Sequence, residues 1–115
     1  MALQLYKNKG GRSSKPKVSI TAAGQIGINA QCADRYFKNK GHVQLYYDID
    51  KKLVGIKGFD KESEYTFKLT KSSGGGSSSV AGRSFLNSCE IDFSKSRRFT
   101  PEWDEKNEIL LIKLE

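Results

Sequence analysis

The residues that most often perform chemistry in proteins are sparse in this chain, which has one histidine and two cysteines. Catalytic triads and cysteine–histidine pairs need a histidine base, so His42 would have to lie beside Cys32 or Cys89 to activate a thiol. A structural zinc site needs four ligands with paired spacing, which these three residues do not supply. We therefore expect a non-enzymatic protein without a metal or other cofactor, and unbridged thiols as in a cytoplasmic protein.

Acidic residues form two groups that a metal-dependent nuclease could use. Asp48 and Asp50 form the first group, and Glu102 and Asp104 begin the second. Both groups fall in candidate hairpin turns, where an aspartate accepts hydrogen bonds from its own backbone. The pattern favours turn structure over a catalytic metal centre.

The glycine-rich stretches do not match a phosphate-binding loop. Residues 74–76 are glycines followed by serines, without the Gly-Lys-Ser/Thr end of such a loop, and the pair Gly24 and Gly27 lacks the third glycine of a dinucleotide-binding turn. Residues 71–79 are predicted to form a Gly/Ser loop that joins a strand to a helix.

Basic residues are the group whose number and placement indicate a ligand. The chain has 20 lysines and arginines against 13 acidic residues, a net charge of +7, and five of these bases lie in residues 1–17 without an acid. Such an arm favours a polyanion, because neutralised phosphates release counterions; a solvated terminus is the alternative. The candidate nucleic-acid-binding residues are Lys7, Lys9, Arg12, Lys15, Lys17, Gln25, Arg35, Lys38, Lys71, Arg83, Arg97 and Arg98.

The apolar pattern predicts a mostly β protein with two short helices, a β-rich α+β fold. Alternating residues indicate strands at 18–20, 43–45, 53–56, 65–69 and 109–112. Helical spacing follows Asn29 and ends at Gly41, and it recurs after Ser78 or Ser79 and ends near residues 90–92.

Length and composition predict one domain. The chain has 115 residues, of which 37% are hydrophobic. The longest apolar run has four residues, too few to span a membrane, and the first residues do not resemble a secretion signal. Leu114 and Glu115 resemble an expression-vector remnant, and we draw no function from them.

An internal repeat divides this domain. Residues 47–57 align without a gap on residues 103–113, so that an aromatic residue, an aspartate, a polar turn, apolar residues and a lysine recur 56 positions later. A candidate helix precedes each copy, and a candidate strand precedes each helix. The sequence therefore predicts an arm at 1–17 and a single domain at 18–115, built from pseudo-repeats at 18–60 and 64–114.

The first repeat resembles the AbrB-type swapped-hairpin family of transition-state regulators and antitoxins. The similarity rests on residues 19–30, the acidic turn at 48–52 and the strand at 53–56, and a degenerate second copy covers 65–114. The chain has Gln25 where the family has arginine and Asn29 where it has proline. The resemblance implies a swapped-hairpin barrel, formed here by two internal units, and DNA binding through basic residues.

We therefore expect a DNA-binding regulator or antitoxin-like protein that contacts duplex DNA through its basic arm and loops. Gln25, Arg35 and Arg83 are the residues expected to contact base edges. The expected partners are duplex DNA and a protein such as a toxin, without a membrane, and the expected state is a monomeric pseudo-dimer or a homodimer. A protein-interaction module that has lost DNA binding is the alternative, followed by a small nuclease.

Overall fold

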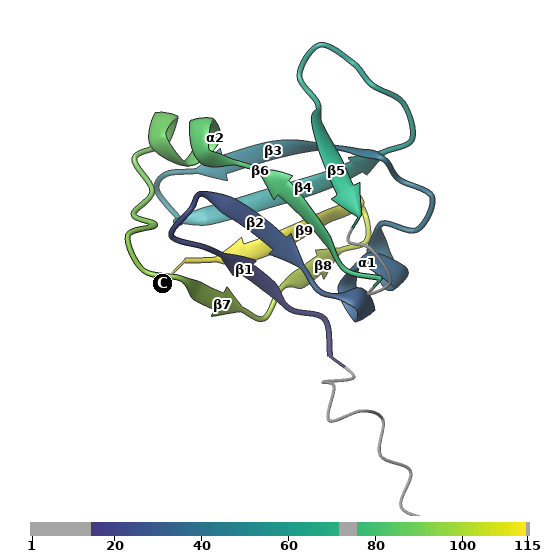
Figure 1. Cartoon of the computed structure of the whole chain (residues 1–115), viewed down its shortest axis with the longest axis horizontal. Coiled ribbons are helices and arrows are strands. Elements are labelled where there is room, and N and C mark those ends of the chain that lie inside the picture. Colours follow the sequence, from purple (N-terminus) through teal and green to yellow (C-terminus); the bar gives the residue numbers. More distant parts are fainter. Residues whose placement is uncertain (1–14, 72–75, 115) are drawn as a thin grey trace, which may run out of the picture.

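The computed structural model describes residues 15–71 and 76–114, which form a sheet of nine antiparallel strands and two short helices (Figure 1). This confirms the predicted β-rich composition. The elements in chain order are β1 (Val18–Ile20), β2 (Gln25–Ile28), α1 (Ala30–Tyr36), β3 (His42–Asp48), β4 (Leu53–Phe59), β5 (Phe67–Lys71), β6 (Ser78–Ala81), α2 (Arg83–Ser88), β7 (Arg97–Phe99), β8 (Glu102–Asp104) and β9 (Ile109–Lys113).

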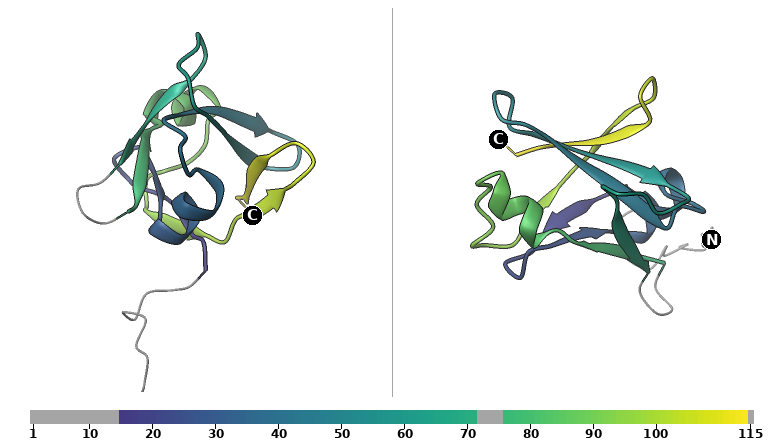
Figure 2. Two further views of the ribbon diagram at one scale, coloured as in Figure 1. Left: turned by 90° about the vertical axis from the view of Figure 1, so that its right-hand side faces the viewer. Right: turned by 90° about the horizontal axis from the view of Figure 1, so that it is seen from above.

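The sheet curls into a half-barrel with the strand order β7-β1-β2-β6-β5-β3-β4-β9-β8 (Figure 2). β7 and β8 stand at the two ends of this order but are separated in sequence only by Thr100 and Pro101. Proline has no N–H to donate to a ladder, so the segment changes partner there, from β1 to β9. The curl brings two layers together, β7-β1-β2-β6-β5 and β3-β4-β9-β8.

The first hairpin depends on a glycine at its turn. β1 and β2 pair so that Ile20 lies opposite Ile26, and both side chains are buried. Gly24 in the turn has a φ of +86°, a conformation that residues with a Cβ rarely adopt. A Cβ on Gly24 would also lie 2.7 Å from the Cβ of Arg83, so glycine permits this turn to contact the start of α2.

Helix α1 begins at an asparagine that holds two segments together. The Asn29 side chain caps the helix by accepting a hydrogen bond from the Cys32 N–H at 2.9 Å. The same oxygen accepts from the Lys17 N–H at 3.0 Å, and the Asn29 amide group donates to the Lys15 carbonyl at 3.1 Å. The helix ends at Tyr36, before the predicted Gly41, and Asn39 then takes a left-handed φ of 65°.

The second helix begins later than predicted, because the serines expected to cap it belong to a strand. Ser78 and Ser79 lie in β6, which pairs with both β2 and β5, and the N-cap of α2 is Gly82. The helix ends at Ser88, short of the predicted 90–92. The predicted loop at 71–79 is correspondingly shorter, since Lys71 pairs with Ser78, and residues 72–75 lie outside the described part of the chain.

The hairpins β3–β4 and β8–β9 have the same register, displaced by 56 residues. Asp48 lies opposite Leu53 in the first hairpin, and Asp104 lies opposite Ile109 in the second. β4 also pairs with β9, and this ladder places Gly55 opposite residue 111, which is again 56 positions later. The ladder between the hairpins is therefore centred on two residues that the sequence alignment treats as equivalent.

The turns of these two hairpins are alike in detail. Asp48 Oδ1 accepts the backbone N–H groups of residues 50 and 51, and Asp104 Oδ1 accepts those of residues 106 and 107. Each turn closes on a residue with a φ of 54°, Lys52 in the first and Glu108 in the second. These bonds confirm that Asp48 and Asp104 serve as turn residues.

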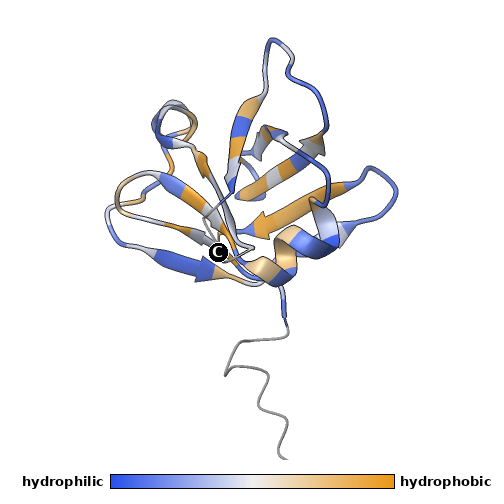
Figure 3. Cartoon of the chain, turned by 45° about the vertical axis from the view of Figure 1, so that its right-hand side comes forward, coloured by the Kyte–Doolittle hydropathy of each residue, from blue (hydrophilic) through white to orange (hydrophobic). Residues whose placement is uncertain are grey.

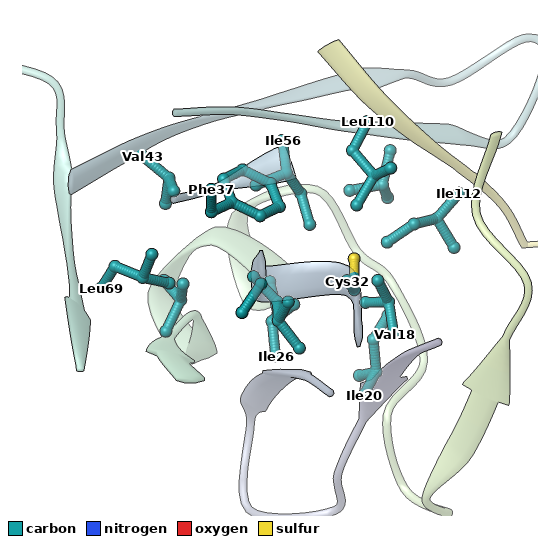
Figure 4. Packing of buried hydrophobic residues seen from close by; sticks show 14 of the residues in the cluster. Val18, Ile20, Ile26, Cys32, Phe37, Val43, Ile56, Leu69, Leu110 and Ile112 are labelled. Carbon is teal, nitrogen blue, oxygen red and sulfur yellow. The ribbon is translucent and has the colours of Figure 1, made fainter. Parts of the chain in front are cut away.

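The core lies inside the curl and takes its side chains from both layers (Figure 4). Hydrophobic residues alternate with hydrophilic ones along several strands, whereas β9 has four successive hydrophobic residues (Figure 3). Phe37, which follows α1, is only 2% exposed and closes the core near that helix. α1 and α2 lie at opposite ends of the half-barrel (Figures 1 and 2). In the part of the chain that is described, neither helix is long and apolar enough to cross a membrane.

Candidate nucleic-acid interface

The two layers of the sheet carry different charges. Strands β7, β1, β2, β6 and β5 contain four cationic residues and no acidic residue, whereas β3, β4, β9 and β8 contain two cationic and three acidic residues. We call the outer side of the first layer the basic face. The strands of the first layer therefore differ from those of the opposite layer in having no acidic residue. The cationic residues of the first layer are Lys68, Lys71, Arg97 and Arg98; those of the second are Lys57 and Lys113, beside Asp48, Glu102 and Asp104.

Small side chains line the middle of the basic face. The pairing registers connect one residue from each strand into a transverse row, and alternation along the strands places this row outside the core. The outer side of Gly27 is close to a neighbour, since a Cβ there would lie 2.7 Å from Ser19 Oγ. The row is therefore low and hydroxyl-rich, with a cation at one end. It consists of Arg98, Ser19, Gly27, Ser79 and Thr70.

Gln25 and Arg83 lie together at one corner of this face. Gln25 is exposed at the start of β2, opposite Ala81 of β6. Arg83 is exposed at the first position of α2, and its Cβ lies against Gly24, the residue before Gln25. The structure therefore brings these two predicted residues together. Their side chains combine an amide and a guanidinium, two groups that can hydrogen-bond to base edges.

The described end of the predicted arm runs beside the same layer. The Lys17 ammonium donates to Thr100 Oγ1 at 2.5 Å, next to the end of β7. The Lys15 carbonyl is held by Asn29, as described above. The other predicted arm residues, Lys7, Lys9 and Arg12, lie outside the described residues.

Arg97 faces the opposite way from its neighbour Arg98. Its guanidinium donates to the carbonyls of Leu114 at 3.4 Å and Asp92 at 3.3 Å, and it lies over the Phe99 ring at 5.2 Å. Successive residues of a strand point to opposite sides, which explains why only Arg98 joins the outer row. In this structure Arg97 therefore connects Leu114 to the loop that follows α2.

Arg35 and Lys38 belong to the other end of the half-barrel. Arg35 lines a depression of about 390 Å³ together with Tyr36, Lys40, Trp103 and residues 58 and 108. The Tyr36 and Trp103 rings stack there with centroids 4.6 Å apart. Because α1 and α2 lie at opposite ends, Arg35 and Arg83 do not form one cluster.

A second depression near α1 contains two further predicted residues. Lys38 and Lys71 both line this hollow of about 410 Å³, which also includes Asp34. The two lysines therefore line the same hollow and lie near an acidic residue.

Lys68 belongs to the basic face, although it is not among the residues predicted from the sequence. The residue is exposed in β5, between the inward-facing Phe67 and Leu69. That alternation is visible in the sequence and could have placed Lys68 on an outer face. The sequence contains no pattern that identifies the small residues of the transverse row, because only strand pairing brings them into one row.

The thiols give no sign of reactivity. Cys32 and Cys89 are free. Burial raises the pKa of Cys32 to about 12, an effect that the positive charge of Arg35 opposes, and burial also raises the pKa of Cys89. A thiol with a raised pKa stays protonated and is a poor nucleophile at neutral pH. Across residues 15–71 and 76–114, no three histidine, cysteine or acidic side chains form a group that could hold a metal ion.

Comparison of the chain with known protein families, with curated proteins and with solved structures gives no match.

Proposed function

We propose that this protein binds duplex DNA through the basic face and acts as a non-enzymatic regulator or antitoxin-like protein in the cytoplasm. The observation that supports the proposal is the separation of charge between the two layers of the sheet. Strands β7, β1, β2, β6 and β5 contain no acidic residue, and two of their cationic residues, Arg98 and Lys68, lie on the outer side.

The shape of the basic face favours contact with the phosphate backbone. Five strands spaced about 4.8 Å apart span roughly 19 Å, which is wider than the DNA major groove of about 12 Å. A face of this width would lie across the groove and meet phosphates on its two sides. The low hydroxyl-rich row of Ser19, Ser79 and Thr70 would permit close approach, while Arg98 and Lys68 would pair with phosphates.

Base recognition in this proposal belongs to the corner formed by Gln25 and Arg83. The corner lies at a turn and a helix start, so its side chains project from the edge of the wide face. A good bidentate contact to a base is worth about 1–3 kcal/mol of discrimination. Phosphate contacts by the arm and the basic face would then supply affinity and orientation, and this corner would supply sequence preference.

We further propose that the architecture is a duplicated swapped hairpin of the AbrB type, with both units in one chain. The order strand-strand-helix-hairpin occurs as β1-β2-α1-β3-β4 and again as β5-β6-α2-β8-β9, with the additional short strand β7 before the second hairpin. The hairpin β3–β4 pairs with β5 and β9 of the second half, and β7–β8 of the second half pairs with β1 and β9. The β3–β4 hairpin of the first half thus pairs with strands of the second half and not with β1 or β2, which is the arrangement that the family resemblance implies.

The experiment that tests DNA binding compares single substitutions on the two layers. Binding of a labelled duplex is measured by fluorescence anisotropy at several salt concentrations. Arg98→Ala and Lys68→Ala should each weaken binding to all sequences and lower the salt slope by roughly 0.9, because each removes one phosphate contact. Lys106→Ala, in the acidic turn of the other layer, is the matched control and should leave both quantities unchanged.

Three results would reject the proposal. Absence of duplex binding at low salt would favour the protein-interaction module, with a toxin or other protein as the partner. Equal effects of Lys106→Ala and Arg98→Ala would mean that binding reflects net charge alone and that the basic face has no special role. Cleavage of DNA that depends on a divalent cation would instead favour the nuclease.

A further inference from the structure

The outer side of the second layer presents a compact apolar patch framed by charges. We call the outer side of β3, β4, β9 and β8 the hairpin face. Pairing registers and alternation place two complete transverse rows of four residues on it. The central row is Tyr46, Gly55, Leu111 and Glu102, and the row on one side is Gln44, Lys57, Ile109 and Asp104. On the other side Asp48, Leu53 and Lys113 are paired, and Thr100 lies next to them in the depression described below.

The apolar residues meet above Gly55 at the centre of this face. A Cβ on Gly55 would lie 3.0 Å from Ile109 Cγ2, 3.4 Å from Tyr46 Cβ and 3.8 Å from Leu111 Cδ2. Tyr46 is 36% exposed, and Leu53, Ile109 and Leu111 are half-buried although they point away from the core. Apolar side chains gathered on an outer sheet face are typical of an interaction site.

On the hairpin face, Tyr46 forms a ridge on one side, and a depression lies on the other side. Tyr46 and Glu102 stand at equivalent positions of the two hairpins, so the tyrosine has no counterpart on the second hairpin. Beside Glu102 the surface forms a depression of about 420 Å³ whose floor includes Leu53 and Leu111. Lys51, Lys113 and Thr100 complete its lining.

We propose that the hairpin face binds a second copy of this chain, related by a twofold axis that runs parallel to the strands. Stacked sheets lie about 10 Å apart with their strands nearly aligned. This axis places Tyr46 of each copy over Glu102 of the other, beside the depression that Glu102 lines. It also places Leu111 of each copy over Gly55 of the other, where the side chains of Ile109, Tyr46 and Leu111 meet. Because the axis is twofold, the contact between Tyr46 of one copy and Glu102 of the other forms twice in the same dimer.

The same twofold axis also places lysines of one copy next to aspartates of the other. Lys113 of one copy stacks on Leu53 of the other, next to Asp48 of that copy. Lys57 stacks on Ile109 of the other copy, next to its Asp104. The lysine stems cover apolar surface while the ammonium groups reach carboxylates that their own turns already hold in place. Four inter-copy ion pairs result, because the axis generates each of them twice.

A twofold axis perpendicular to the strands does not give this fit. It would stack Tyr46 on Tyr46, so the ridges would collide while the hollows remained empty. It would also stack Glu102 on Glu102, a repulsive contact. The residues of the face therefore select one orientation of the second copy. This proposal does not depend on DNA binding, because the hairpin face and the basic face belong to different layers.

The first experiment measures the oligomeric state of the full chain by sedimentation velocity, from micromolar to millimolar concentration. Wild-type protein should dimerise, and the double variant Lys57→Glu/Lys113→Glu should be monomeric, because the introduced glutamates would then repel the aspartates of the other copy. Arg98→Ala is the matched control on the other layer and should dimerise as wild type. A wild type that stays monomeric at millimolar concentration overturns the proposal, as does a dimer that the double variant leaves intact. Circular dichroism of each variant shows that it is folded.

The second experiment tests the orientation by disulfide cross-linking in a Cys89→Ser background, since Cys32 is buried. Tyr46→Cys and Glu102→Cys proteins are mixed under mild oxidation. The proposed axis predicts a disulfide between the two different variants and little product from either variant alone. Rapid self-linkage of the Tyr46→Cys protein would overturn the orientation, and equal rates for all combinations would overturn a specific interface.

Discussion

Replacement of Asn29 by alanine should destabilise the fold by about 2 kcal/mol, because one side chain makes three hydrogen bonds. Loss of a helix N-cap costs about 1 kcal/mol. Loss of the bond from the Lys17 N–H costs about 1 kcal/mol, and the more exposed bond to the Lys15 carbonyl contributes roughly half as much. The bonds have lengths of 2.9, 3.0 and 3.1 Å. In a domain of about 100 residues such a change lowers Tm by roughly 10 °C.

Urea unfolding monitored by tryptophan fluorescence measures this loss directly. Trp103 is the single tryptophan and stacks on Tyr36 at the end of α1, so its emission reports on the docking of this helix. Asn29→Asp is the matched control, because a carboxylate keeps both acceptor bonds and loses only the donor, and it should retain most of the stability.

Asn29→Pro tests whether Asn29 stabilises the protein through its hydrogen bonds or only through a backbone conformation that starts a helix. The backbone φ of Asn29 is −69°, which suits proline, but proline would lose the three side-chain bonds as well as the backbone bond from Asn29 N–H to the Lys17 carbonyl. It should therefore be at least as destabilising as alanine. An alanine variant within about 0.5 kcal/mol of wild type, the range expected for surface substitutions without a structural role, would refute the reasoning.

Three further predictions follow from single residues. Gly24→Ala should destabilise the protein by about 1–3 kcal/mol in thermal unfolding, because a positive φ and the contact with Arg83 both oppose a Cβ; unchanged stability would contradict the close approach. Because burial raises the pKa of Cys32 from 9.0 in the unfolded chain to about 12, its contribution to stability is complete below pH 9 and is lost between pH 9 and about 12, and Cys32→Ala should flatten that part of the pH–stability profile. The side-chain and backbone hydrogen bonds from Asn107 lower the pKa of Asp104, so Asn107→Ala should move the Asp104 carboxyl titration, followed by NMR, toward higher pH. A titration that does not move would show that this side-chain bond is not formed in solution.

Local pattern predicted a mostly β protein with two short helices, but it did not predict the strands β2, β6, β7 and β8. The expected strand at 18–20 matches β1, and those at 43–45, 53–56 and 109–112 lie within β3, β4 and β9. Serines 78 and 79 were assigned to a loop because serine and glycine favour loops when only neighbours in sequence are considered. Their place in β6 depends on hydrogen bonds from β2 and β5, which are distant in sequence. Tyr65 was included in a strand but lies before β5 and is 73% exposed.

The sequence by itself determined which residues could form the candidate site, since charge and side-chain type are fixed by composition. The +7 net charge and the bases at Lys17, Arg83 and Arg98 were evident without coordinates. Tertiary structure decided which of them lie close together: α1 and α2 lie at opposite ends, so Arg35 is separated from the corner of Gln25 and Arg83.

The same distinction holds for neighbouring residues of one strand. Arg97 and Arg98 are equal in the sequence, but pairing with β1 turns Arg98 outward and leaves Arg97 to bind backbone carbonyls at the end of the half-barrel. The charge pattern of the sequence predicts the sign of the charge that a ligand would carry. The separation of charge between two layers is a property of strand order, which depends on long-range hydrogen bonds and the burial of a shared core.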